Sequence, residues 1–249
     1  MPYSIGLAGK GGTGKTTLAG FMIRHLIEKG RVPVLAVDAD ANSNLNEVLG
    51  LEIRDTLGGL REAMKRGAPA GMTKDVFMEM KLEQAVVEAR GFDLIAMGRP
   101  EGPGCYCAAN ALLTRSLDRL MKNYAYVVID NEAGMEHISR LTTKEVNLLL
   151  VVSDPTRRGI QAAARICGLC DELNLRAERK CLVVNQARVN QYEEIRRMAM
   201  EFNLDLAGMI PEDPEVRQLD LEGRPTKDLK SESRALQRAF DLFDDLLPH

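Results

Sequence analysis

The chain has 249 residues, of which 45% are hydrophobic, and this is enough apolar material for a large buried core. Its net charge is −3 and its basic residues are scattered, so it lacks the concentrated positive charge that a nucleic-acid partner requires. It contains no run of about 18 apolar residues and no leader-like N-terminus, and we therefore expect a cytoplasmic, soluble protein without a membrane partner.

Short apolar runs rich in Val, Ile and Leu alternate along the chain with amphipathic stretches. The apolar runs predict strands at 3–8, 32–37, 92–97, 124–129, 147–152, 180–185 and 206–210. The amphipathic stretches predict helices at 16–29, 110–122, 156–173, 191–202, 213–221 and 232–247. Strands that are apolar throughout are typical of a parallel sheet buried on both faces. The order predicts an α/β fold, a single domain over residues 1–249 with one doubly wound, mostly parallel sheet flanked by helices.

Residues 51–91 do not follow this alternation. The segment is rich in charge and glycine and has two short helical patches, but it shows no clear strand. We interpret it as an inserted or mobile surface segment.

The first predicted strand is followed directly by "GKGGTGKT", residues 9–16, which satisfies the P-loop pattern G-x-x-x-x-G-K-[ST] and opens a predicted helix. Glycines let backbone N–H groups surround phosphates, while Lys15 can reach the β- and γ-phosphates and the Thr16 hydroxyl can bind Mg²⁺. The expected nucleotide-binding residues here are Gly9, Lys10, Gly11, Gly12, Thr13, Gly14, Lys15, Thr16 and Thr17.

The second lysine of this loop carries a family resemblance. "KGGTGKTT" resembles the deviant Walker A motif of the MinD/ParA and nitrogenase-iron-protein class of P-loop ATPases, also called SIMIBI. The resemblance implies a homodimer in which Lys10 crosses to the phosphates of the partner subunit. Lys10 and Lys15 would then both be catalytic, because a cation supplied in trans stabilises the transferring phosphoryl group only in the closed dimer.

Two acidic segments resemble the switch regions of the same class. In "VDADANSN", Asp38 and Asp40 resemble switch I carboxylates, and we favour Asp40 for orienting the attacking water or holding Mg²⁺. Ala41 departs from the proline that many relatives have there. In "VVIDNEAGMEH", Asp130 suits a Walker B role and Gly134 suits switch II, so the expected magnesium residues are Thr16, Asp40 and Asp130.

The sequence also predicts which nucleobase the protein binds. In "VVNQAR", Asn185 ends a predicted strand where relatives use asparagine to bind the base, and Arg188 stands where a guanine-specific site needs aspartate. Guanine would lack its carboxylate acceptor, so ATP/ADP is favoured over GTP. "GMIPEDPEV" resembles the segment that flanks adenine in this class, with Pro211 and Glu212 contributing mainly backbone groups.

Cys105 and Cys107 lie one residue apart in "GPGCYC". Two thiolates can face one ion but leave a four-coordinate metal half-satisfied, and a two-fold axis would add a second pair to give Cys₄. Such a site suits Ni²⁺ if square-planar or Zn²⁺ if tetrahedral, and sulfur alone does not choose between them. By contrast, Cys167, Cys170 and Cys181 read as core packing.

"GPGCYC" together with "DNEAGMEH" resembles the CooC/AcsF type of nickel-insertion ATPase. The resemblance implies nickel bound between subunits by Cys105 and Cys107, with apo carbon monoxide dehydrogenase or acetyl-CoA synthase as the client. Two alternatives stay open. An iron–sulfur ATPase would need a second cysteine near switch II, and none lies between Cys107 and Cys167. A MinD/ParA-like positioning ATPase would need a membrane helix or a DNA-binding surface, whereas the C-terminal amphipathic helix has an acidic polar side and should dock on the domain.

Overall fold

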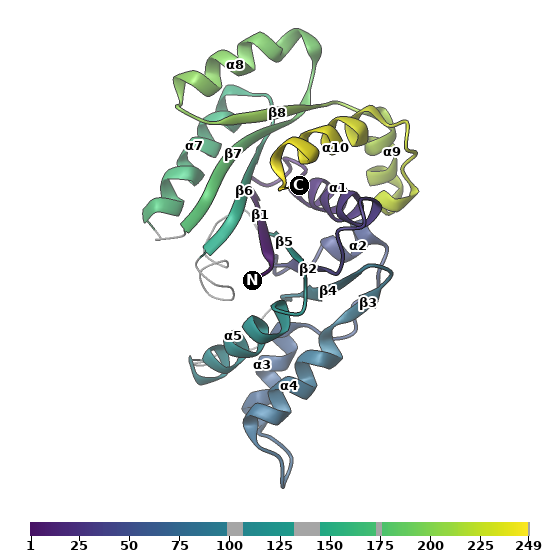
Figure 1. Cartoon of the computed structure of the whole chain (residues 1–249), viewed down its shortest axis with the longest axis vertical. Helices are drawn as coiled ribbons and strands as arrows, with labels where there is room; N and C mark the ends of the chain where they lie inside the picture. The colour runs from purple at the N-terminus through teal and green to yellow at the C-terminus, as the bar shows by residue number, and fades with distance from the viewer. Residues whose placement is uncertain (99–106, 132–144, 173–175, 249) are drawn as a thin grey trace.

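The computed structural model of the chain describes residues 1–98, 107–131, 145–172 and 176–248 (Figure 1). The strands are β1 (Tyr3–Gly9), β2 (Val34–Asp38), β3 (Val87–Ala89), β4 (Phe92–Ala96), β5 (Tyr126–Asp130), β6 (Glu145–Ser153), β7 (Arg176–Ala187) and β8 (Leu206–Pro211). The α-helices are α1 (Lys15–Glu28), α2 (Leu45–Leu49), α3 (Leu57–Arg66), α4 (Lys74–Ala85), α5 (Cys107–Met121), α7 (Arg157–Glu172), α8 (Tyr192–Glu201), α9 (Pro214–Glu222) and α10 (Arg234–Leu246). Two 3₁₀ helices are η1 (Val189–Gln191) and η2 (Thr226–Asp228).

The described strands form one eight-stranded sheet in the order β3-β4-β2-β5-β1-β6-β7-β8. All neighbours are parallel except β3 and β4, which pair antiparallel. The strand β1, which leads into the P-loop, lies in the interior of the sheet between β5 and β6. The predicted doubly wound, mostly parallel α/β architecture is confirmed.

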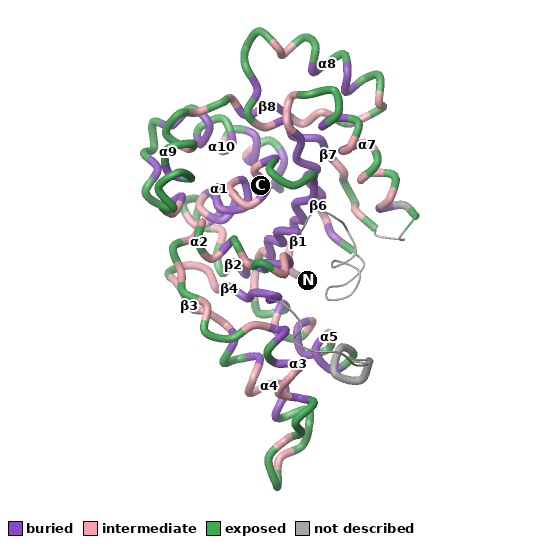
Figure 2. Tube along the Cα trace, turned by 180° about the vertical axis from the view of Figure 1, so that it is seen from behind, coloured by how far each residue is buried: buried purple, intermediate pink, exposed green. Residues whose placement is uncertain are grey.

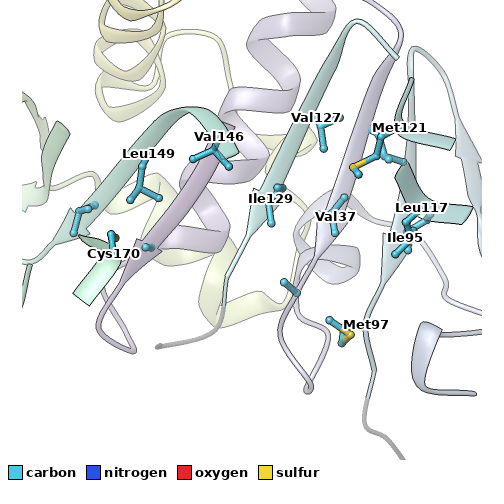
Figure 3. Packing of buried hydrophobic residues seen from close by; sticks show 14 of the residues in the cluster. Val37, Ile95, Met97, Leu117, Met121, Val127, Ile129, Val146, Leu149 and Cys170 are labelled. Carbon is cyan, nitrogen blue, oxygen red and sulfur yellow. The ribbon is translucent and has the colours of Figure 1, made fainter. Parts of the chain in front are cut away.

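Helices cover both faces of this sheet because successive strand residues point to opposite sides. On β5, Val127 and Ile129 join one hydrophobic cluster and Val128 joins the other. Helices α3, α4, α5, α7 and α8 bury their apolar residues in the first cluster, and α1, α2, α9 and α10 bury theirs in the second. Figure 2 shows the resulting buried strands, and Figure 3 shows residues of the first cluster, among them Val127, Ile129, Val146 and Met121.

Residues 51–91 form part of the connection from β2 to its neighbour β4. The two helical patches are α3 and α4, whose buried residues include Leu57, Leu60, Phe77 and Met78. The expectation of no strand in this segment is wrong, because β3 pairs with β4 at the sheet edge. Three residues are too few to show an alternation that sequence reasoning could detect.

Helix α10 docks on the domain, as predicted from its acidic polar side. Its apolar residues Leu236, Leu242, Phe243 and Leu246 are buried, and the helix packs against α1 and β8. Within the described ranges, no helix has both the length and the hydropathy needed to span a bilayer.

Candidate functional site

The residues predicted to act on a nucleotide gather at one edge of the sheet. The P-loop leaves the end of β1, Asp38 ends β2, Asp130 ends β5, and Asn185 and Pro211 lie at the ends of β7 and β8. Because these strands are parallel, their carboxyl ends meet at the same edge, which is where open α/β sheets bind ligands.

The P-loop has the backbone of an anion cradle. Gly12 and Gly14 adopt left-handed φ values of 80° and 84°, which side chains other than glycine rarely adopt. A Cβ added at Gly11 or Gly12 would meet nothing within 4 Å, so the loop borders open space on that side. Successive backbone N–H groups at the start of α1 can therefore face an anion there.

Two side chains brace this loop from within. The Thr13 hydroxyl donates to the Lys10 carbonyl at 2.9 Å, and the Lys15 ammonium donates to the same oxygen at 3.3 Å. Lys15 is only 8% exposed, whereas Lys10 is exposed. The buried Lys15 is compatible with binding phosphates in its own subunit, and the exposed Lys10 is compatible with reaching the phosphates of a partner subunit.

A hollow of about 240 Å³ lies beside the P-loop and brings together Asn185, Pro211 and Glu212, the three residues expected near the base. Gly14 and Thr17 of the P-loop segment line it as well. Sequence reasoning did not identify the rest of the lining, which is Leu18, Phe21, Gln186, Asp213, Val216, Arg217, Asp220 and Ala235. The lining is mixed, because apolar side chains such as Leu18, Phe21 and Val216 lie beside amide and charged groups, so it offers both a surface for a planar ring and polar groups that could bind the ring's edge.

Asn185 is hydrogen-bonded to protein groups on both sides of its amide. Its Nδ2 donates to the Thr13 carbonyl at 2.9 Å, and its Oδ1 accepts from the Gln186 backbone N–H at 3.0 Å. The side chain therefore connects β7 to the P-loop while it lines the hollow.

Two buried carboxylates stand next to each other beside the P-loop. Asp38 and Asp130 are register partners on β2 and β5 and are 0% and 2% exposed. Burial raises the pKa of Asp130 to about 7, although the hydrogen bond from the Thr16 hydroxyl acts in the opposite direction. Burial also raises the pKa of Asp38 to about 6, although its backbone hydrogen bonds oppose this.

These carboxylates fit a divalent cation. Among the described residues, Oδ1 of Asp130 is buried without a hydrogen-bond partner, so it has an unused acceptor site. In the same residues no three His, Cys, Asp or Glu side chains gather closely enough to hold a metal by themselves. Mg²⁺ suits such a place, because it typically takes one or two carboxylates together with phosphate oxygens.

Asp38 and Asp40 have different surroundings, and the sequence did not separate them in this way. Asp38 accepts hydrogen bonds from the backbone N–H groups of Asp40 at 3.0 Å and Leu45 at 2.9 Å, so it holds the turn that leads into α2. Asp40 is partly exposed and accepts from Asn42 N–H at 2.7 Å. The sequence does contain a sign of this difference: Asp38 continues the apolar run of a predicted strand, which indicates burial, whereas Asp40 lies beyond the run.

The predicted cargo site cannot be described in the same detail. Cys105 and Gly134 lie outside the described residues, and Cys107 is the first residue of α5 with its side chain also outside them. The other three cysteines are packing residues as predicted: Cys170 and Cys181 are buried, and Cys167 packs against the first cluster.

Known proteins resemble the chain over nearly its whole length. The family model of the CobQ/CobB/MinD/ParA nucleotide binding domain matches residues 5–226. An uncharacterized ATP-binding protein of Methanocaldococcus jannaschii is 38% identical over 248 residues, with 98% of each chain covered. The carbon monoxide dehydrogenase accessory protein CooC of Rhodospirillum rubrum is 33% identical, covering 92% of this chain and 91% of its own.

Solved structures resemble the fold. The septum site-determining protein MinD of Pyrococcus horikoshii, solved with Mg-ADP, superposes with a TM-score of 0.72 at 23% identity, covering 99% of this chain and 96% of its own. A ParA family ATPase of Chlorobium tepidum superposes with a TM-score of 0.73 at 19% identity, covering 97% and 98%.

Proposed function

The chain belongs to the CobQ/CobB/MinD/ParA nucleotide-binding domain family, and from this membership we propose that it binds ATP with Mg²⁺ and hydrolyses it as a homodimer. One observation carries the proposal. The phosphate cradle, the buried carboxylates and the hollow lined by Asn185 all lie at the same edge of the sheet. A nucleoside triphosphate has three parts with matching chemistry: phosphates, a bound cation and a planar base.

Each part of the site has a role in this proposal. The P-loop N–H groups and Lys15 bind the β- and γ-phosphates, and Asn185 faces the base. Thr16, Asp40 and Asp130 would hold Mg²⁺, with Asp38 shaping the turn beside them. Bound magnesium would supply positive charge against the phosphate oxygens.

Hydrolysis requires water to attack the γ-phosphorus while its bond to the bridging oxygen of ADP breaks. Asp40, which is partly exposed, orients this water, and Lys10 of the partner subunit stabilises the charge on the transferring group. A cation that arrives only on dimer closure makes hydrolysis depend on assembly. The products are ADP and phosphate.

We propose further that this cycle serves nickel-site maturation. Cys105 and Cys107 from two subunits would hold one Ni²⁺ as cargo, with Zn²⁺ as the competing ion, and release it to apo carbon monoxide dehydrogenase or acetyl-CoA synthase. The similarity to CooC over most of both chains supports this. A histidine store plays no part, since the chain has three histidines in all.

Metal titration of the anaerobic apoprotein, with absorption spectra and molar mass recorded, tests this proposal. We expect one Ni²⁺ per dimer with thiolate charge-transfer bands, and loss of both in a Cys105→Ser/Cys107→Ser variant. Cys167→Ser/Cys170→Ser is the matched control, because it removes two thiols from α7 and should leave the nickel stoichiometry unchanged. Equal nickel affinity in the Cys105/Cys107 variant would overturn the cargo site.

A positioning ATPase is the second candidate, favoured by the structural similarity to MinD and ParA proteins. Such a protein requires a surface that binds a membrane or DNA. Helix α10 has its apolar side buried against α1 and β8, which disfavours membrane insertion by this helix. ATP-dependent co-sedimentation with anionic liposomes would support the positioning function over the maturation one.

A further inference from the structure

We propose that Asn185 is a positioning residue that holds the P-loop in its phosphate-binding conformation, besides lining the base hollow. This inference rests on the proposed binding of ATP. It concerns a single contact, the hydrogen bond between the Asn185 amide and the Thr13 carbonyl, which joins segments 172 residues apart.

The contact controls the direction of a peptide group in the loop. The Thr13 carbonyl belongs to the peptide that joins Thr13 to Gly14, and a trans peptide is planar with its C=O and N–H pointing in opposite directions. Drawing this carbonyl to Asn185 at 2.9 Å therefore turns the Gly14 N–H away from β7. The hydrogen bond thus sets the orientation of a group at the start of α1.

The P-loop backbone is packed closely against the Asn185 amide. A Cβ added at Gly14 would lie 2.3 Å from Nδ2 of Asn185, so the loop backbone passes directly against the amide. Gly14 also has a φ of 84°, which only glycine adopts without strain. The glycine before Lys15 is needed here for Asn185 as well as for the turn.

The amide is held in one orientation from both sides. Gln186 has a left-handed φ of 56°, at an irregularity in the pairing of β7 with β8 between Val184 and Ala187. Its N–H donates to Oδ1 of Asn185 at 3.0 Å. Rotating the amide by half a turn would place N–H against N–H and oxygen against oxygen, so Nδ2 must face Thr13.

This orientation leaves the amide with unused capacity on both atoms. An asparagine amide has two N–H donors and two oxygen lone pairs, and one of each is used. The remaining donor and acceptor match the N7 acceptor and N6 amino donor of adenine, whereas guanine offers two acceptors, N7 and O6. Holding the loop and reading adenine can therefore occur together.

Comparing ATP with a ligand that has no base separates the two roles. Magnesium tripolyphosphate presents phosphates alone, so loss of a base contact leaves its affinity unchanged. If Asn185 holds the loop, Asn185→Ala should weaken tripolyphosphate binding by about fivefold to tenfold, because the loop would occupy its binding conformation less often. ATP affinity should fall by at least as much, as measured by isothermal titration calorimetry.

Asn147 supplies a matched control. Its Oδ1 accepts from the Ser4 backbone N–H at 2.9 Å and so also bridges two segments of the sheet, away from the P-loop. Asn147→Ala should lower the melting temperature without changing tripolyphosphate affinity. Asn185→Asp is the second variant, since it keeps the acceptor for Gln186 but places an oxygen against the Thr13 carbonyl, and it should lose more phosphate affinity than the alanine variant.

The outcomes are distinguishable. Wild-type affinity for tripolyphosphate in folded Asn185→Ala and Asn185→Asp, with ATP binding reduced, would overturn the positioning role and leave ATP binding intact. A wild-type protein that binds neither ligand would overturn the proposed function itself. Reduced affinity for both ligands in the Asn185 variants, but not in Asn147→Ala, is the result we expect.

Discussion

Asp213 ties together the two C-terminal helices beside the base hollow, and replacing it should destabilise the protein measurably. Its Oδ1 caps α9 by accepting from Glu215 N–H at 2.9 Å. Its Oδ2 accepts from the Ser233 hydroxyl at 2.7 Å and from Ala235 N–H at 3.1 Å, at the start of α10. The expected perturbation is therefore loss of a cap and of a link between helices.

The contacts set the size of the effect. An N-cap is worth about 1 kcal/mol, and hydrogen bonds to a charged group contribute about 1.5 to 3 kcal/mol each. Asp213 is partly exposed, so water replaces part of the loss. We expect Asp213→Ala to reduce the free energy of unfolding by about 2 to 4 kcal/mol. Asp213→Asn should cost less, because asparagine still caps α9.

The pH dependence gives a second measure of the same contacts. Burial raises the pKa of Asp213, but the hydrogen bonds from Ser233, Ala235 and Glu215 outweigh it and leave the pKa lowered. A lowered pKa means that the stabilisation is present above the unfolded value of 3.8 and is lost as the pH falls through the folded value. The difference between wild type and Asp213→Asn should therefore shrink below about pH 4.

Urea unfolding followed by circular dichroism between pH 3 and pH 8 measures both effects. A double-mutant cycle with Ser233→Ala isolates the link to α10, and a coupling of about 1 kcal/mol is expected for neighbours that share a hydrogen bond. If Asp213→Ala cost less than about 0.5 kcal/mol, a value typical of ordinary surface substitutions, the assignment of Asp213 as a link would be refuted.

Three further predictions concern other parts of the molecule. Burial lowers the pKa of His25 below 6.5 despite the charge of Asp244. As the pH falls, the unfolded chain therefore takes up the proton before the folded protein does, and stability should fall as the pH drops through 6.5. Melting temperatures measured from about pH 5 to 8 should show this decrease in wild type and a smaller one in His25→Phe. Phe243 lies on the buried side of α10 and is 0% exposed, so Phe243→Ala should cost about 3 to 5 kcal/mol in urea unfolding, against less than about 0.5 kcal/mol for Met200→Ala at a 74%-exposed position. Lys10→Ala should keep its ATP affinity but lose about 10³-fold or more in turnover. Mixing Lys10→Ala with Asp40→Ala should restore activity, because one site of the mixed dimer then has both its own Asp40 and the lysine of the partner subunit. A mixture as inactive as its parts would contradict action in trans.

Contiguous signals made much of the fold predictable. The P-loop is eight adjacent residues between a strand and a helix, and the longer strands are unbroken apolar runs, so the predicted helices and most predicted strands lie within a few residues of the observed ones. The short elements α2 and β3, of five and three residues, carry no period for a pattern to reveal.

The parts of the site that were missed depend on distant segments. Asp213 meets Ser233 only because α9 and α10 begin side by side, and Asn185 meets Thr13 only across the assembled sheet. The family resemblance predicts that Asn185 lies near the base, but its contact with Thr13 cannot be predicted from its neighbours in sequence. The role of Asp38 in holding the turn into α2 depends on backbone N–H groups that reach it only in the folded chain.

The interior position of β1 has a consequence for synthesis of the chain. Tyr3–Gly9 leaves the ribosome before its partners β5 and β6, which begin at Tyr126 and Glu145. Closing contacts at such separations is slow, and an apolar strand without partners is prone to aggregate while it waits. The phosphate-binding loop is synthesised well before the strands on either side of β1, so the nascent chain can complete its nucleotide site only after those strands have been made and paired.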